Sequence, residues 1–517
     1  SDAEPLSSAF GSLVFTGVED DPATLETLRR LGFGDPPAVS ATIRAWHHGR
    51  IAATRTEHGR ELFTRLAPRL LEACHVAGAP DAAFRRFGDF FTGLRTGVQV
   101  QSLFLAQPEL FELVVRVMAF APRLAAVLAK SPAALDSLLD RGFFAPFAAE
   151  EAEIALQAAL AATGGGYEAA LDAARRVHRE HAFRIGVQVM SGAAGAAEAG
   201  PAFAGLADAC IRGLAQASLQ EISRQAGAFA GDVAVVALGR CGSREMTAGS
   251  DLDLMTLYEA AEPGAVSLIR GWSAETFFAR FTQRLIAALS APTAEGGLYQ
   301  VDMRLRPSGT AGPVAVSRAA FQSYYAREAE TWEFLALTRA RVVWASSPTF
   351  AVQTEADIEK VLRQPRDAGE TARAVRAMRV LMAEEHPAKG EWDMKRSSGG
   401  LIDIEFAAQH LQIVHAAAGG PLRPNTAQAL EAIEAAALAP APAVRSLTTA
   451  WRMQQNLSQN LRVALEADAD PALEPPAFRA LLAQAGGARD FAALRPRLRK
   501  LRAAAHAAYE MLVPADG

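Results

Sequence analysis

Apolar residues recur at three- and four-residue spacing along most of the chain, which predicts a mainly helical protein. The segment 54–74 is typical, with one apolar face made by Leu62, Phe63, Leu66, Leu70 and Leu71. The same spacing continues over residues 97–140. There Pro108, Pro122 and Pro132 separate successive helices, because proline cannot continue a helix from within.

A glycine cluster at residues 164–166 interrupts the helical pattern, and one long helical stretch is expected over 167–226. Three strand-like segments follow. Residues 232–239 form a nearly continuous, β-branched apolar run, as expected of a buried strand. Residues 251–258 and 298–307 alternate between polar and apolar positions, as half-buried strands do.

After Ala345 the helical pattern returns and continues to the end of the chain. The predicted fold class is therefore mainly α with one α/β domain: a helical bundle, a small mixed-sheet domain and a C-terminal helical bundle. We expect three domains, residues 1–145, 146–350 and 351–517, since 517 residues are too many for one hydrophobic core.

Composition excludes several classes of protein. Half of the residues are apolar, which argues against extensive disorder, and the net charge of −5 disfavours a non-specific nucleic-acid binder. Cys74, Cys210 and Cys241 are too far apart for a zinc site and form no disulfide framework, which favours a reducing cytoplasm. No apolar run is long enough for a membrane span or a signal peptide.

Three aspartates carry the candidate chemistry. Residues two apart on a strand share a face, so Asp251 and Asp253 should project together. By the same argument Asp302, Arg304 and Arg306 share one face of the later strand. If the two strands are neighbours, three carboxylates converge beside two guanidinium groups.

Such a carboxylate cluster needs cations. Two like charges about 4 Å apart repel by about 4 kcal/mol at an effective dielectric constant near 20. Carboxylate oxygens favour Mg²⁺ or Mn²⁺ over zinc, and two metal ions can stabilise both ends of an in-line phosphoryl transfer. The turn with Gly239, Gly242 and Ser243 precedes these aspartates and is suited to an ATP triphosphate. Arg304 and Arg306 could bind phosphate or pyrophosphate, or hold Asp302 in a salt bridge.

Two further segments have competing interpretations. Residues 331–344 mix aromatic residues with Arg339 and Arg341, which is equally typical of helix packing. Lys395 precedes a Ser-Ser-Gly-Gly turn and could contact the triphosphate. Asp403 and Glu405, near the start of the next helix, are as well explained by helix capping.

Histidine spacing gives no zinc site. His178 and His181 lie three apart on a helix with no metal-ligand partner nearby in the sequence, and we expect them to lie at the surface or to pack between helices.

The motif over 235–258 resembles the signature of the glutamine synthetase adenylyltransferases, which are polymerase-β-type nucleotidyltransferases. The resemblance extends over 299–317, 330–343 and 395–411, and back to 97–114 and 167–192. Those enzymes carry two nucleotidyltransferase domains, and this chain resembles the C-terminal, adenylylating half with its preceding helical linker.

The resemblance implies transfer of AMP from ATP to a tyrosine of glutamine synthetase in the cytoplasm, regulated by a PII-type signal protein and glutamine. It implies two Mg²⁺ ions held by Asp251, Asp253 and Asp302. The expected nucleotide-binding residues are Gly239, Gly242, Ser243, Ser250, Arg304, Arg306 and Lys395. Ser397 and Ser398 depart from the Gly-Pro common in the family, so no contact is expected there.

Two other functions stay open. The chain could be a nucleotidyltransferase acting on RNA or a small molecule, although the acidic balance disfavours RNA. It could also act mainly as a regulatory module that binds signal proteins through its helical regions.

Overall fold

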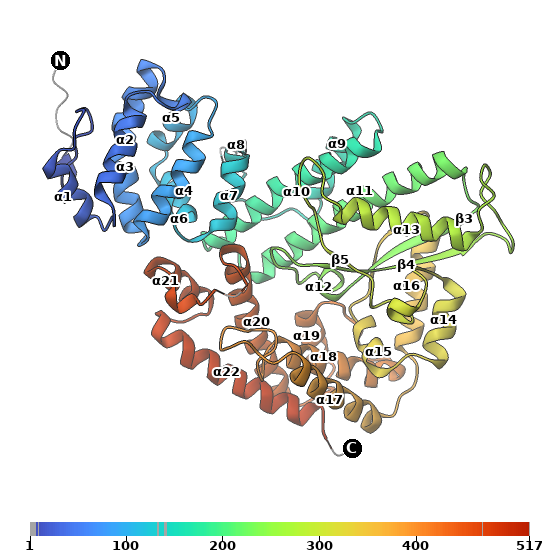
Figure 1. Cartoon of the computed structure of the whole chain (residues 1–517). Helices are drawn as coiled ribbons and strands as arrows, with labels where there is room; N and C mark the ends of the chain where they lie inside the picture. The colour runs from blue at the N-terminus through green and yellow to red at the C-terminus, as the bar shows by residue number, and fades with distance from the viewer. Residues whose placement is uncertain (1–6, 9, 132–133, 139–141, 468, 516–517) are drawn as a thin grey trace.

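The computed structural model of this chain describes residues 7–8, 10–131, 134–138, 142–467 and 469–515. Helices dominate, and one small mixed sheet lies in the middle of the chain (Figure 1). The predicted fold class is therefore confirmed. Pro108 and Pro122 each begin a helix as expected, whereas Pro132 lies outside the described residues.

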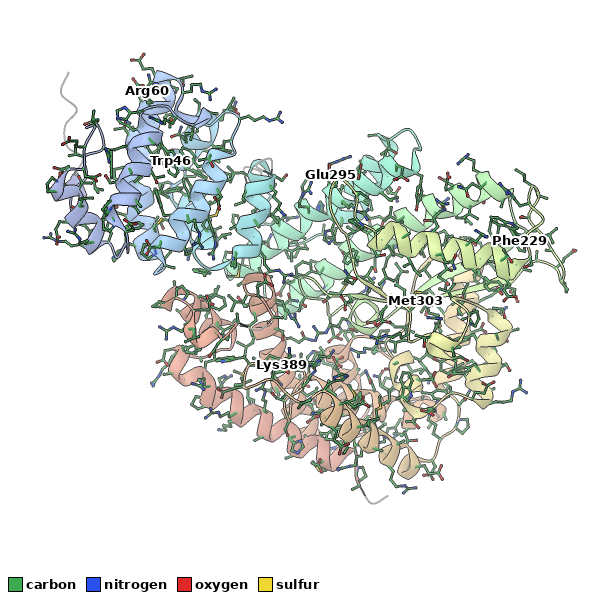
Figure 2. All side chains as sticks on the ribbon, viewed as in Figure 1. Trp46, Arg60, Phe229, Glu295, Met303 and Lys389 are labelled. Atoms are coloured by element: carbon green, nitrogen blue, oxygen red, sulfur yellow. The ribbon has the colours of Figure 1, made fainter. Side chains whose placement is uncertain are left out.

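The N-terminal region is a layered stack of helices around an aromatic core. Trp46, labelled in Figure 2, has its ring centroid 6.0 Å from that of Phe63 and 5.4 Å from that of Phe91. The elements are β1 (Ser7–Ser8), β2 (Gly11–Ser12), α1 (Pro22–Arg30), α2 (Pro36–His47), η1 (Ala52–Thr54), α3 (Glu57–Val76), α4 (Pro80–Thr92), α5 (Val98–Ala106), α6 (Pro108–Phe120), α7 (Pro122–Lys130) and α8 (Ala134–Leu138).

The middle region holds the sheet between helices. Its elements are α9 (Glu151–Ala161), α10 (Tyr167–Met190), α11 (Ala196–Ala226), β3 (Gly231–Leu238), α12 (Gly239–Ser243), β4 (Leu252–Ala260), α13 (Ala274–Ser290), β5 (Val301–Asp302), η2 (Gly309–Ala311), β6 (Ala315–Ser317), α14 (Arg318–Arg327), α15 (Thr331–Leu337) and β7 (Arg341–Ala345). The stretch expected as one helix over 167–226 is two helices, because Gly192 takes a positive φ of 77° after α10 ends.

The sheet has the order β5-β4-β3-β7, and β6 pairs with the same edge of β4 as β5 does. β3 runs antiparallel to β4 and β7, while β5 and β6 run parallel to β4. Helices α11 and α13 lie on one side and α14 and α16 on the other (Figure 1). Both faces of β3 are covered, which explains its continuous apolar sequence.

Two expectations, a strand over 298–307 and helix packing over 331–344, need correction. The segment 298–307 forms a strand only over β5, and a series of turns follows Asp302, since this short edge strand pairs on one side only. The segment 331–344 is not one packed helix: after α15 the chain turns and residues 341–345 join the sheet as β7. The short β-branched run at Val342 and Val343 is the signal for that strand.

The C-terminal region is helical, as predicted. Its elements are α16 (Pro348–Leu362), α17 (Ala368–Glu385), α18 (Leu401–His415), η3 (Ala416–Ala418), α19 (Thr426–Ala435), α20 (Ala441–Ala464), η4 (Pro471–Leu473), α21 (Pro476–Ala485) and α22 (Phe491–Leu512). Helix α20 packs against α10, α11 and α22, so this region contacts the middle one closely. Among the described residues, no helix has the length and apolarity needed to cross a bilayer.

Candidate active site

The candidate carboxylates gather at one end of the sheet. Asp253 of β4 lies directly opposite Asp302 of β5 in the parallel pairing, so the two strands are neighbours, which is the condition that the convergence of the carboxylates required. Asp251 is exposed and immediately precedes β4. Burial raises the pKa of Asp253, and the neighbouring carboxylates of Asp302 and Asp251 raise it further, while Arg339 and Lys395 oppose the rise. This end of the sheet therefore concentrates negative charge.

The carboxylate of Asp302 forms a salt bridge with the guanidinium group of Arg304. Arg304 bonds both carboxylate oxygens of Asp302, with Nε to Oδ2 at 2.8 Å, and its hydrogen bonds are the main reason that the pKa of Asp302 is lowered. The Arg304 side chain is 75% exposed, so this pair lies at the surface. Within the described residues, no three His, Cys, Asp or Glu side chains stand close enough together to hold a metal ion.

Arg306 lies elsewhere. Its guanidinium donates to the backbone carbonyl oxygens of Met303, Gly312 and Pro313, at 2.8, 3.1 and 2.9 Å. Arg306 thus closes the turn that follows β5, and a phosphate contact by this residue remains a prediction.

The glycine turn after β3 is tightly packed against the aspartates. A Cβ on Gly239, whose φ is 54°, would lie 2.1 Å from Oδ2 of Asp253. A Cβ on Gly242 would lie 2.0 Å from the carbonyl oxygen of Arg339. Glycine is therefore required at both positions by the packing of the chain itself.

The two serines of this segment make internal contacts. Ser243 is fully buried, and its hydroxyl lies 3.4 Å from the carbonyl oxygen of Arg240. The hydroxyl of Ser250 accepts a hydrogen bond of 2.9 Å from the backbone N–H of Thr247. Nucleotide contacts by Ser243 and Ser250 remain predictions.

A cavity of about 790 Å³ adjoins the glycine turn, and its lining holds more basic than acidic side chains, the acidic ones being Glu391, Asp393, Glu466 and Asp470. Arg240 of α12, Lys395 and Arg396 of the segment before α18, and Arg462 of α20 all face it. Lys389, labelled in Figure 2, belongs to the same lining. Within the described part of the chain, the side chains of Arg240, Lys395 and Arg462 form no ion pair.

These basic groups repel one another. Burial lowers the pKa of Arg240, and Arg339 and Arg462 lower it further, against the opposing effect of Glu405. Partial burial also lowers the pKa of Lys395, with Arg240 among the causes. Arg240, Lys395 and Arg462 form no ion pair among the described residues, and such unpaired cations favour an anionic ligand.

Arg339 joins the two halves of the site. It pairs with Glu405 of α18 at 3.3 Å, and it also opposes the raised pKa of Asp253. Glu405 therefore has a partner in the site. Asp403 instead caps α18, because its carboxylate accepts from the backbone N–H of Gly399 at 2.7 Å and pairs with Arg379.

Sequence reasoning missed part of this basic cluster. Arg240 stands inside the glycine motif, and its position between Gly239 and Gly242 was an available signal. Arg462 belongs to an ordinary amphipathic helix, and only the fold brings it to the cavity.

The C-terminal helices hold the segment that follows the glycine turn. Nε2 of Gln459 donates to the carbonyl oxygen of Met246 at 2.6 Å, and Nδ2 of Asn425 donates to that of Ser243 at 3.1 Å. The backbone N–H of Thr426 donates to Oε1 of the buried Glu245. Burial raises the pKa of Glu245 to about 7, and the nearby Glu405 adds to the rise.

Comparison with known proteins agrees with this architecture. The family model described as "Glutamate-ammonia ligase adenylyltransferase" matches residues 111–357, and the one described as "GlnD PII-uridylyltransferase" matches residues 372–513. The first range contains all three candidate aspartates. The second contains α18 to α22 and most of α17.

Curated relatives match over nearly the whole chain. The bifunctional glutamine synthetase adenylyltransferase/adenylyl-removing enzyme of Caulobacter vibrioides is 63% identical over 510 residues, which are 99% of this chain and 51% of the relative. The proteins of the same name in Rhizobium meliloti and Brucella suis are each 40% identical, over 99% of this chain and 52% of their own length. This chain therefore spans about half the length of the curated relatives it matches, and the resemblance predicted from the motifs is confirmed.

Proposed function

Since residues 111–357 carry the glutamate-ammonia ligase adenylyltransferase domain, we propose that this chain transfers AMP from ATP to a tyrosine hydroxyl of glutamine synthetase and releases pyrophosphate. The pairing of Asp253 with Asp302 beside a basic cavity is the observation that carries this proposal. Carboxylates on one side and cations on the other suit an in-line displacement at a phosphate.

The chemistry of the three aspartates suits magnesium, and their side chains would have to draw closer together to hold an ion, because the described residues contain no ready-made cluster. Their donor set is oxygen only, and burial and the acidic neighbours raise the pKa of Asp253 against the opposing effect of Arg339 and Lys395. Asp251, Asp253 and Asp302 would hold two Mg²⁺ ions. Bound there, the ions would lower the pKa of the tyrosine hydroxyl and neutralise charge on the phosphates. Asp302 would be free to bind an ion only after its salt bridge with Arg304 has broken. The exposed position of the Arg304 guanidinium allows that side chain to move away.

The basic side chains would act on the other end of ATP. Arg240, Lys395 and Arg462 bind the triphosphate and then the departing pyrophosphate, because they line the cavity next to the glycine turn. Arg339 is held in place by Glu405 and lies between this cavity and Asp253, where its charge would act on both the phosphates and the aspartate.

A second role concerns regulation. The match of residues 372–513 to a PII-uridylyltransferase family favours a PII-type signal protein as a partner of the C-terminal helices. Pull-down of a PII-type protein by the full chain would support this role, and the expected regulation by glutamine would be tested in the same assay. An RNA or small-molecule acceptor remains the alternative to glutamine synthetase.

The decisive experiment is transfer of label from [α-³²P]ATP to purified glutamine synthetase with Mg²⁺. The matched control is the double variant Asp251→Ala/Asp253→Ala, which should transfer no label and still bind glutamine synthetase. Absence of transfer by the unmodified chain, with glutamine and a PII-type protein present, would remove glutamine synthetase as the acceptor.

A further inference from the structure

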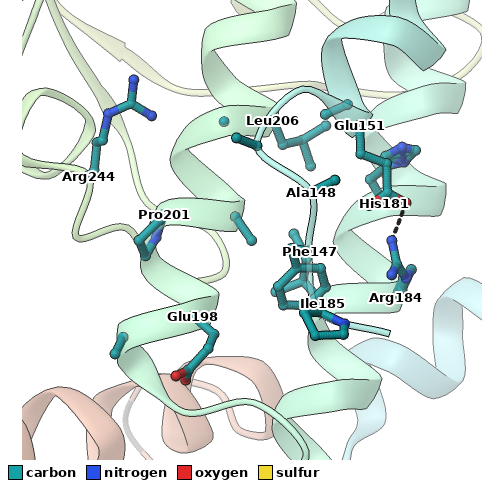
Figure 3. A pocket seen from close by; sticks show the side chains of 16 residues that line it. Phe147, Ala148, Glu151, His181, Arg184, Ile185, Glu198, Pro201, Leu206 and Arg244 are labelled. Carbon is teal, nitrogen blue, oxygen red and sulfur yellow. Dashed lines mark hydrogen bonds and ion pairs between the residues drawn. The ribbon is translucent and has the colours of Figure 1, made fainter. Parts of the chain in front are cut away.

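A second cavity lies apart from the candidate active site. It measures about 300 Å³ and opens between α9, α10 and α11, under the segment 146–149 (Figure 3). Its walls are mainly apolar and include Phe147, Ile185, Pro201 and Leu206. This volume and this lining are typical of pockets that bind small molecules. None of the candidate aspartates belongs to the lining.

Two charged residues at this cavity are already satisfied. Arg184 pairs with Glu151, donates to the carbonyl oxygen of Phe143 at 2.9 Å and stacks over the ring of Phe147 at 5.2 Å. Glu198 accepts a hydrogen bond of 2.9 Å from the backbone N–H of Gly195 and so caps α11. Neither residue needs a ligand.

Arg244 differs from them. Its only ion pair among the described residues is a 3.4 Å contact with Asp208. Arg341 already holds both oxygens of Asp208, at 2.7 and 2.8 Å. Burial lowers the pKa of Arg244, and the charge of Arg341 lowers it further. Arg244 is thus a cation at an apolar cavity whose single acidic partner is neutralised by another arginine.

One more polar atom lacks a partner. Nε2 of His181 is buried and makes no hydrogen bond within the described chain, and His181 lines the cavity. In Figure 3, Arg244 lies on one side of α11, and Phe147 and Ile185 lie on the other.

We propose that this cavity binds a small organic monoanion, an aromatic or branched aliphatic carboxylate whose apolar body packs on Phe147, Ile185 and Leu206 and whose carboxylate pairs with Arg244. The site is separate from the proposed transfer of AMP. It nevertheless touches the same segment, because Arg244 directly follows α12. The carbonyl oxygen of Arg244 lies 3.2 Å from the position of a Cβ on Gly200 of α11, so the cavity wall and the turn pack together closely.

Gly205 of α11 offers a precise way to fill the cavity. A Cβ at this position would meet only the carbonyl oxygen of Ala149, at 3.9 Å, so a side chain can be added without a backbone clash. Gly205→Phe places a ring in the cavity, and Gly205→Ala is the matched control that leaves most of the space open. Both substitutions favour helix formation over glycine.

The probe is 3-phenylpropionate, observed by saturation-transfer NMR with the full chain. We expect binding to the unmodified chain and to Gly205→Ala, and binding at least about tenfold weaker to Gly205→Phe. Arg244→Gln should weaken the binding of 3-phenylpropionate by about tenfold and leave the binding of the neutral 3-phenylpropionamide unchanged. Circular dichroism of each variant checks that the fold is kept.

Each contrary result would overturn the proposal. Failure of the unmodified chain to bind at millimolar probe, or equal binding by Gly205→Phe, would mean that the cavity is not the site. If Arg244→Gln weakened the binding of 3-phenylpropionate and of 3-phenylpropionamide equally, Arg244 would not recognise the charge of the carboxylate. Since no step uses ATP, these results are independent of the test for AMP transfer.

Discussion

The backbone N–H of Thr426, at the start of α19, donates a 2.6 Å hydrogen bond to Oε1 of Glu245, which follows the glycine turn of the candidate active site. This carboxylate is buried, and its pKa of about 7 means that the folded chain holds a proton that the unfolded chain, with a pKa of 4.5, releases. The contribution of Glu245 to stability should therefore fall as the pH rises from about 4.5 to about 7 and change little above that range.

Glu245→Gln should flatten this dependence. The amide oxygen still accepts from Thr426, but it carries no charge beside Glu405. We expect the free energy of unfolding of the original chain to lose up to about 3 kcal/mol relative to the variant between pH 4.5 and pH 7. Urea unfolding at several pH values measures it, and parallel curves for the two proteins would contradict the assignment.

Asp253→Asn should separate activity from stability. The substitution removes a charge that Asp302 and Asp251 oppose, so the free energy of unfolding should rise by about 1 kcal/mol. The rate of AMP transfer should fall by about 10³-fold, since the variant lacks a carboxylate that would bind Mg²⁺. Thermal unfolding and label transfer measure the two effects, and loss of both properties together would indicate a structural role.

Arg304→Gln should free Asp302 for a cation. Arg304 bonds both oxygens of Asp302 and lowers its pKa, so its removal is expected to tighten binding of Mn²⁺ by about threefold to tenfold. Calorimetry with Mn²⁺ and no nucleotide gives this affinity directly. Arg327→Gln, which removes an arginine from helix α14, is the control.

Arg240→Ala should weaken ATP binding by about tenfold, because a cation without an acidic partner leaves the cavity beside the glycine turn. Arg495→Ala is the matched control: Arg495 lines the same cavity but is paired with Glu391 at 2.7 Å. Equal ATP affinities in the two variants would exclude the basic cluster as the triphosphate site.

Gly242→Ala tests the packing of the turn. The added methyl group would lie 2.0 Å from the carbonyl oxygen of Arg339, and we expect a loss of about 3 kcal/mol in the free energy of unfolding. Gly205→Ala, in the open environment of α11, should be neutral or slightly stabilising. Denaturant unfolding of both variants compares them.

The local pattern of apolar and polar residues predicts those strands whose faces are each uniformly buried or uniformly exposed. The central strand β3 is covered on both faces and reads as an apolar run, while β4 alternates at its start, so Asp253 could be assigned to the polar face. Both strands follow from period and burial alone.

Edge elements and distant contacts were less predictable. β5 is two residues long because it pairs only with β4, and alternation over 298–307 could not show where pairing ends. Arg462 and Thr426 reach the site through the packing of α20 and α19, and nothing in their own sequence marks that destination. The spacing of Arg306 from Asp302 predicted that both side chains lie on one face of a strand, but Arg306 donates hydrogen bonds to backbone carbonyl oxygens of the turn instead.

The hydrogen bonds that reach Ser243, Glu245 and Met246 cross from one family match to the other, since the matches end at residue 357 and begin again at residue 372. A recombinant that joined these two segments from different parents would bring together a turn and a set of helices that had never been selected side by side. The donors at Asn425 and Gln459 would have to be inherited with the acceptors they serve. In evolutionary terms, the boundary between the two matches is a poor crossover point.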